Sequence, residues 1–221
     1  MINNLYIIFP EIFLSLSIFS ILMIGVFIKK SFNIVFNLTS LILIVTISII
    51  LTNPSNEEKI FLESFIRDDF SNYFKILILL SSLFVLNSSK KFIIDCKLDK
   101  FEYPIIILLS ILGMFFMVSA NDLILFYLGL ELQSLSLYIL ASIDRDNLRS
   151  TESGIKYFVL SALSSGLLLY GCSLLYGFTG TTNFELMAGQ LNKENTGAVF
   201  AMVFILVGLA FKVSAVPFHM W

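Results

Sequence analysis

Charged side chains are scarce in this sequence. Only 14% of its 221 residues are Asp, Glu, Lys or Arg, and the net charge is −2. Such a chain lacks the basic patch of a nucleic-acid-binding protein. Hydrophobic residues make up 57% of the chain, and the mean hydropathy is +0.92. A water-soluble domain of this size cannot bury that much apolar surface, so the composition predicts a polytopic membrane protein.

Residues that bind metals or redox groups are equally few. The chain has two cysteines, Cys96 and Cys172, and one histidine. Two cysteines do not give the spacing of a metal site, and we expect no disulfide between them. The sequence has no phosphate-binding loop, dinucleotide fingerprint, haem or iron–sulfur ligand pattern, or catalytic triad. We therefore expect no metal, cofactor or redox centre within this chain.

Seven apolar segments predict membrane-spanning helices and an all-α fold, because lipid offers no partner for unpaired backbone groups. A span needs about 20 residues. The third segment is short, and we expect it to extend from Phe70 to Ser88 with Lys75 snorkelling to the surface. The segments are Leu5–Ile28, Phe32–Leu51, Tyr73–Leu86, Pro104–Ala120, Leu123–Ile143, Ile155–Phe178 and Gly197–Pro217.

The loops give the chain a predicted orientation. The loops on the N-terminal side carry four Lys or Arg residues, and the loops on the opposite side carry nine. Basic loops mark the cytoplasmic or matrix side, so the N-terminus is predicted on the other side. The loop from 52 to 72 is acidic but contains apolar residues, which favours an interfacial element over free coil. Residues 183–191 have the pattern of a short amphipathic helix at the surface.

Glu131 is a charged residue near the middle of the fifth apolar segment. A charge at the bilayer centre costs roughly 2.5–3.5 kcal/mol on insertion scales, so such a residue usually has a partner or a function. One interpretation is a carboxylate that exchanges protons in a polar cavity. The alternative is a structural hydrogen bond or ion pair between helices. Gln133, Ser134 and Ser136 follow Glu131 and can hydrogen-bond to neighbouring helices or order water.

Lys212 lies toward the C-terminal part of the seventh segment. One interpretation is that it snorkels to the surface. Against this, residues 213–216 remain largely apolar, and Pro217 predicts a break in the helix. A helix broken within a membrane usually lines a cavity and marks an ion path. His219 follows the break, where it can relay protons near neutral pH or serve as a polar interface residue beside Trp221.

Several motifs resemble one family. Leu130–Leu135 resembles the fifth-helix motif of chain 2 (NADH dehydrogenase subunit 2), an antiporter-like membrane subunit of NADH:ubiquinone oxidoreductase, respiratory complex I. Ser150–Phe158 and Tyr176–Gly180 resemble later parts of the same subunit. Gly208–Lys212 followed by Val216–Trp221 resembles its broken seventh helix. The resemblance covers nearly the whole chain.

The resemblance implies an antiporter-like inverted-repeat fold, of which this chain represents the N-terminal half. Residues 1–103 would form a three-helix membrane segment. Residues 104–221 would form an incomplete first repeat of four helices, the last broken near residue 217. Glu131 and Lys212 match the charge pair of a proton half-channel, with Pro217 and His219 as further candidates. Pairing favours the charged form of both groups and separation favours the neutral forms, so such a pair can switch protons.

The resemblance also implies partners and a location. Other membrane subunits of complex I and lipids would surround the chain, and a second polypeptide would carry the rest of the subunit, as a split organellar gene would allow. FMN, iron–sulfur clusters and ubiquinone would bind elsewhere in the complex. We expect a multi-pass protein of the mitochondrial inner membrane, with its N-terminus on the intermembrane-space side. The first residues lack a signal or transit pattern, which fits synthesis inside the organelle.

Two other functions are compatible with the sequence. The chain can be a subunit of a multisubunit cation/proton antiporter, which shares the Glu and Lys plan, although Gln133 and Ser134 after Glu131 argue against it. It can also be a structural scaffold that pumps nothing. A normal proton-to-electron stoichiometry in Lys212→Met and Glu131→Gln variants would favour the scaffold.

Overall fold

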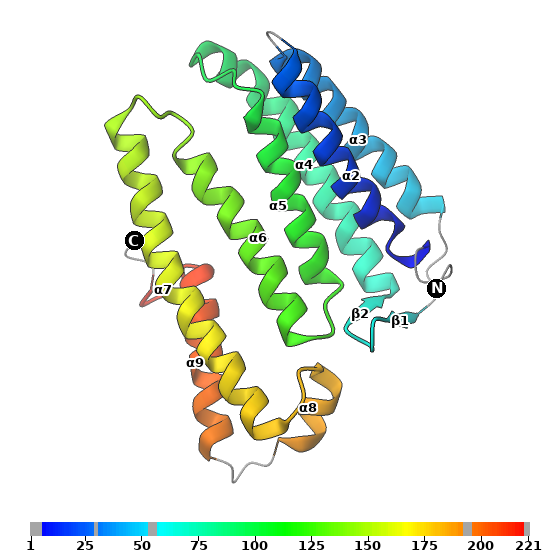
Figure 1. Cartoon of the computed structure of the whole chain (residues 1–221), viewed down its shortest axis with the longest axis vertical. Helices are drawn as coiled ribbons and strands as arrows, with labels where there is room; N and C mark the ends of the chain where they lie inside the picture. The colour runs from blue at the N-terminus through cyan, green and yellow to red at the C-terminus, as the bar shows by residue number, and fades with distance from the viewer. Residues whose placement is uncertain (1–5, 29–30, 53–56, 192–195, 219–221) are drawn as a thin grey trace.

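The computed structural model describes residues 6–28, 31–52, 57–191 and 196–218, which are mostly helical (Figure 1). By length and composition, α2, α3, α4, α6 and α7 are each able to cross a membrane, and α5 and α9 are apolar helices of 17 residues. The predicted all-α, multi-span architecture is therefore confirmed. The helices are α2 (Phe9–Phe27), α3 (Phe32–Thr52), α4 (Asp69–Asp95), α5 (Glu102–Val118), α6 (Leu123–Ala141), α7 (Leu148–Thr179), α8 (Phe184–Gln190) and α9 (Thr196–Lys212).

Polar side chains fix where several helices begin. Asp68 and Ser71 form a capping box at the start of α4, each accepting a hydrogen bond from the backbone N–H of the other. Asp122, Asn147 and Asn183 accept backbone N–H groups at the starts of α6, α7 and α8. These caps satisfy N–H groups that have no partner within a helix, and each is typically worth about 1 kcal/mol.

Helices α2 to α5 form a bundle. α2 packs against α3 and α5, and α4 packs against the same two helices, so α2 and α4 lie opposite one another. The core of this bundle contains fully buried apolar side chains from each helix, including Leu14, Leu43, Leu79, Leu108 and Phe115. In lipid, van der Waals packing rather than removal from water holds such helices together.

Two glycines let α5 and α6 cross at close range. A Cβ atom added at Gly113 would lie 2.7 Å from the carbonyl oxygen of Gly129, and one added at Gly129 would lie 2.9 Å from that of Gly113. Real side chains do not tolerate such distances, so only glycine permits this crossing. The crossing attaches α6 to the bundle two residues before Glu131.

Helices α7 and α9 form a second close pair. A Cβ atom at Gly171 would lie 2.8 Å from Ile205, and one at Gly208 would lie 2.6 Å from Leu168. Gly166, also on α7, takes no part in this close packing, because an added Cβ there would meet nothing within 4 Å.

The loop between α3 and α4 contains a small β hairpin. Strand β1 (Glu58–Ile60) pairs antiparallel with β2 (Phe65–Arg67). The prediction of an ordered element rather than free coil is confirmed, although the sequence did not indicate strands, and its position at the membrane interface stays a prediction. The hairpin docks on the neighbouring loops because the carbonyl oxygen of Glu63 accepts hydrogen bonds from the side chains of Asn121 and Asn183.

The predicted amphipathic helix at 183–191 is also confirmed, as α8 (Phe184–Gln190). The hairpin, α8 and the start of α2 lie at the same end of the molecule (Figure 1). Lys59 of β1 forms an exposed ion pair with Glu185 of α8, with 2.6 Å between Nζ and Oε1. Hydrogen bonding to this carboxylate raises the pKa of Lys59 above its ordinary value.

The expectation that Lys75 snorkels to the surface is wrong. Its side chain is 2% exposed, and its Nζ lies 2.6 Å from Oε1 of Glu11 on α2. The helix begins earlier than the apolar pattern indicated, at Asp69, so Lys75 lies nearly two turns inside α4. At that position it faces the centre of the bundle, where α2 supplies the opposite charge.

Candidate functional site

Glu131 projects from the middle of α6 toward α7 and α9. Its Oε1 atom accepts a hydrogen bond from the Ser165 hydroxyl of α7 at 2.5 Å. The same oxygen lies 3.2 Å from Nζ of Lys212. The carboxylate is 21% exposed within this chain, so it is largely withdrawn from the surface. Hydrogen bonds to an ionised group are roughly twice as strong as those between neutral groups.

Lys212 is the last residue of α9. The predicted helix break near Pro217 therefore occurs five residues earlier. The chain turns because Ser214 adopts a left-handed conformation with φ of +55°, and the N–H of Ala215 then bonds to the carbonyl of Ala210 at 2.9 Å. Left-handed residues of this kind commonly end helices. The turn leaves Lys212 at the helix terminus.

Three oxygen atoms of α6 surround the Lys212 ammonium. It donates to Glu131 Oε1 at 3.2 Å, to Ser134 Oγ at 2.9 Å and to Tyr138 Oη at 3.2 Å. Positions 131, 134 and 138 lie on one face of a helix, three and four residues apart. An ammonium has three N–H donors, so all three find acceptors. Lys212 is 11% exposed and does not snorkel.

Aromatic packing holds Tyr138 in place for this contact. Its ring packs edge-on against two rings of α7. The ring centroids lie 4.7 Å apart for Tyr157 and 5.8 Å apart for Phe158. Such edge-to-face pairs are worth about 0.5–1.5 kcal/mol beyond the burial of their area. The phenol oxygen is thereby fixed beside Lys212.

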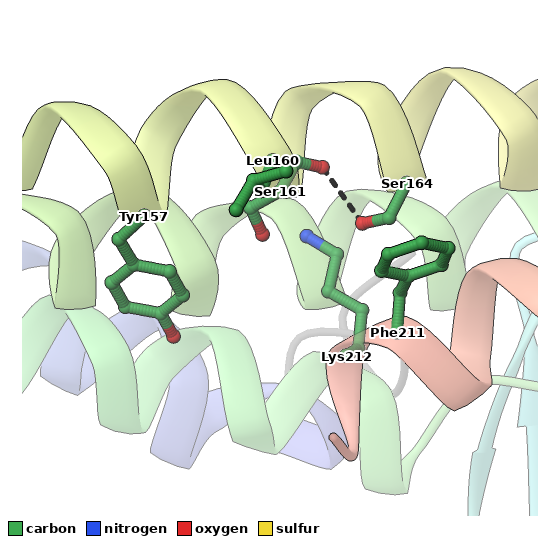
Figure 2. Close-up of a pocket in the computed structure, with 6 residues that line it drawn as sticks. All are labelled: Tyr157, Leu160, Ser161, Ser164, Phe211 and Lys212. Atoms are coloured by element: carbon green, nitrogen blue, oxygen red, sulfur yellow. Dashed lines mark hydrogen bonds between the residues drawn. The ribbon is translucent and has the colours of Figure 1, made fainter. Parts of the chain in front are cut away.

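A small pocket adjoins the pair on the α7 side. Figure 2 shows Lys212 extending from the end of α9 toward the stretch of α7 that carries Ser161 and Ser164. The Ser164 hydroxyl donates to the carbonyl oxygen of Ser161 at 2.8 Å. Serine hydroxyls of this kind rotate readily and both donate and accept hydrogen bonds. Lys212 therefore has polar groups of α6 on one side and serine hydroxyls of α7 on the other, although all three helices are largely apolar.

The sequence interpretation located only part of this arrangement. Ser134 was expected to hydrogen-bond to a neighbouring helix, and it does. Sequence reasoning did not single out Ser165 or Tyr138 as site residues, although the spacing of seven residues between Glu131 and Tyr138 was a usable signal. Pro217 lies beyond the end of α9, and His219 lies outside the described residues.

Comparison with known proteins places this geometry in context. The family model described as NADH:quinone oxidoreductase/Mrp antiporter, TM, matches residues 120–221. NADH-quinone oxidoreductase subunit N of Pelagibacter ubique is 55% identical over 220 residues, which are 99% of this chain and 47% of that protein. The chain is therefore similar, along nearly its whole length, to antiporter-type membrane subunits named subunit N. It spans about half the length of the curated relatives it matches.

Two solved structures are also similar to this chain. A chain of respiratory complex I from Thermus thermophilus superposes with a TM-score of 0.80 and 27% identity, covering 96% of this chain and 45% of that one. A chain of the Mrp complex from Dietzia sp. gives a TM-score of 0.74 at 22% identity, covering 98% and 42%. The second likeness shows the fold alone. The curated relatives are bacterial and are named subunit N.

Proposed function

We propose that this chain forms part of the membrane arm of proton-pumping NADH:ubiquinone oxidoreductase, an enzyme complex, and contributes Glu131 and Lys212 to a proton half-channel. The observation that carries the proposal is the Lys212 ammonium held by Glu131, Ser134 and Tyr138 between apolar helices. The similarity to subunit N of bacterial enzymes supports it.

The geometry suits an ion pair whose two side chains separate and come together again. In a low-dielectric site, removing a partner charge strongly disfavours the remaining one. If Lys212 moves away, Glu131 keeps the Ser165 hydroxyl as a donor, and Lys212 keeps Ser134 and Tyr138 as acceptors. Each group is therefore partly stabilised in the separated state, which lowers the barrier to exchanging a proton with its next neighbour.

The finer assignment is also a proposal. We assign the chain to NADH dehydrogenase subunit 2 in the mitochondrial inner membrane from its sequence resemblance to that subunit. The charge bias of the loops supports an N-terminus on the intermembrane-space side. Other membrane subunits of the complex and lipids are its proposed neighbours. A second polypeptide would supply the helices that the longer relatives carry. FMN, iron–sulfur clusters and ubiquinone would bind outside this chain. Intact-mass spectrometry of the purified complex tests the second polypeptide directly.

The test is substitution of the pair in the assembled complex. Lys212→Met and Glu131→Gln should each lower NADH–quinone turnover and the accompanying proton uptake in reconstituted vesicles. Glu152→Gln and Lys156→Met are matched controls, since this ion pair has the same residue types but is exposed on α7. Unchanged proton-to-electron ratios in both site variants would contradict the proposal and favour a scaffold.

A cation/proton antiporter subunit is the second candidate, because the fold is shared with the Mrp complex. The two candidates differ in their neighbours. Flavin and iron–sulfur proteins should co-purify with this chain if it belongs to complex I. Their absence, together with sodium–proton exchange in vesicles, would favour the antiporter.

A further inference from the structure

The bundle of α2 to α5 contains a second buried ion pair, far in sequence from the first. Glu11 and Lys75 have side chains that are 1% and 2% exposed, with 2.6 Å between Oε1 and Nζ. The contact lacks hydrogen-bond geometry, and neither carboxylate oxygen of Glu11 has a hydrogen-bond partner among the described residues. This differs from Glu131, whose Oε1 accepts two hydrogen bonds.

The surroundings of Lys75 favour a permanent positive charge. Its Nζ lies 5.2 Å from the ring centroid of Phe65 and 5.8 Å from that of Phe115. Aromatic faces attract an ammonium by cation–π interaction and offer nothing comparable to a neutral amine. The two rings therefore add to the attraction that holds the Lys75 ammonium at this position.

Other charged residues at this end of the bundle lie on the hairpin, which carries Glu58, Lys59 and Glu63 besides Arg67, and at the start of α4. Arg67 follows Phe65 by two residues, so it shares that face of β2, and it is 6% exposed. Asp68 and Asp69 stand at the start of α4, where Asp68 serves as the cap. α3 carries no ionisable side chain, and the only carboxylate of α5, Glu102, lies at the opposite end of that helix.

Ser119 brings a hydroxyl to the same region. It follows Phe115 by one helical turn, just past the end of α5, and its carbonyl accepts a hydrogen bond from Ile66 of the hairpin at 2.9 Å. Its side chain oxygen is buried and also has no hydrogen-bond partner in the described part of the chain. Buried side-chain oxygen and nitrogen atoms without a partner are rare in native proteins, and in the described part of the chain they belong to Glu11 and Ser119 alone.

A buried carboxylate without hydrogen bonds is poorly stabilised as an anion, even beside a cation. We propose that Glu11 is a second proton-binding carboxylate of this subunit, with Lys75 as its fixed cation; this rests on the proposed function. A proton from water at the hairpin end of the molecule adds to a Glu11 carboxylate oxygen and forms the carboxylic acid. Lys75 keeps its proton, so the site changes from neutral to singly positive, and release of the proton restores the ion pair.

Infrared difference spectroscopy of the assembled complex during NADH–quinone turnover tests this proposal. The wild type should show the C=O stretching band of a buried carboxylic acid, and Glu11→Gln should lose it. Glu11→Asp keeps an ionisable group and should shift the band. Glu152→Gln is the control, since its exposed carboxylate should contribute no such band. A spectrum unchanged by Glu11→Gln would overturn the proposal.

The double variant Glu11→Gln, Lys75→Met separates proton binding from a purely structural ion pair. Removing both charges leaves no unpaired buried charge, so this variant should assemble even if Glu11→Gln alone does not. A proton-binding role predicts a reduced proton-to-electron ratio in the assembled double variant. A normal ratio would show that the pair only fastens α2 to α4. Glu131→Gln is measured in parallel. If Glu131→Gln impairs pumping and the double variant does not, the Glu11 proposal fails while the proposed function stands. If neither impairs pumping, the proposed function fails.

Discussion

The close crossing of α5 and α6 makes a quantitative prediction for Gly113→Ala. The new Cβ would lie 2.6 Å from the backbone nitrogen of Gln133 and 2.7 Å from the carbonyl oxygen of Gly129, whereas ordinary contact begins at 3.4 Å. The two helices must therefore separate by about 0.8 Å. Overpacking of this kind costs about 1–3 kcal/mol. Both obstructing atoms belong to the backbone, so no side chain can rotate aside.

The displacement reaches the candidate site directly. Glu131 follows Gly129 by two residues, and its contacts are 2.5 Å to Ser165 and 3.2 Å to Lys212. A shift of several tenths of an ångström moves the longer contact out of hydrogen-bond range. A misplacement of about 1 Å can lower a rate by about a hundredfold. We expect less assembled complex on native gels and at least a tenfold lower turnover per assembled complex.

Gly166→Ala is the matched control, because its Cβ would meet nothing within 4 Å. Both substitutions gain about 1 kcal/mol of helix propensity, so that contribution cancels in the comparison. The remaining difference between the variants is the overlap at the crossing. Equal assembly and equal turnover for Gly113→Ala and Gly166→Ala would refute the reasoning.

Substitutions at three further positions have clear expected outcomes. Ser165→Ala removes a hydrogen bond to the Glu131 carboxylate, worth about 1.5–3 kcal/mol, and should slow turnover about tenfold or more, whereas Ser165→Thr should not. Tyr138→Phe removes one of the three acceptors of the Lys212 ammonium, also a hydrogen bond to a charged group worth about 1.5–3 kcal/mol, so it should slow turnover to an extent similar to Ser165→Ala. Lys59→Gln should change neither turnover nor thermal stability, because its ion pair is exposed and is screened by solvent.

Hydrophobic runs predicted the spans well because composition and length alone decide whether a segment suits a membrane. The ends of the spans were less predictable. α4 extends over Asp69–Asp95, well past the apolar core of its segment, because a capping box fixes its start and polar residues continue its end. α9 ends at Lys212 rather than near Pro217, since the backbone conformation at Ser214 ends the helix first.

At the candidate site, the sequence indicated the two charged residues but not all of their hydrogen-bond partners. Glu131 and Lys212 stood out because a charge within an apolar segment is rare. Ser165 did not, since serines are common in membrane helices as packing residues. Its role depends on which face of α7 meets α6. That is a property of the packed structure, and residues 34 positions apart in sequence give no local sign of it.

Glu11 was missed for a related reason. It lies near the start of its segment, where a charge can reach the surface at little cost, and Lys75 lies near the start of another. The hairpin and the opposing helices cover that end of the bundle, so neither side chain reaches the surface. Snorkelling is a fair expectation for an isolated helix, but tertiary packing decides whether the path to water stays open.

The two ion pairs differ in what remains when each is broken. Lys212 without Glu131 retains Ser134 and Tyr138, and Glu131 without Lys212 retains Ser165. That pair can therefore separate by movement, with both charges still hydrogen-bonded. Glu11 accepts no hydrogen bond from the described residues, so moving Lys75 away would leave a bare buried anion. Protonation in place is the change open to that carboxylate. The two sites should accordingly respond to different perturbations: helix displacement at the first, and removal of the ionisable group at the second.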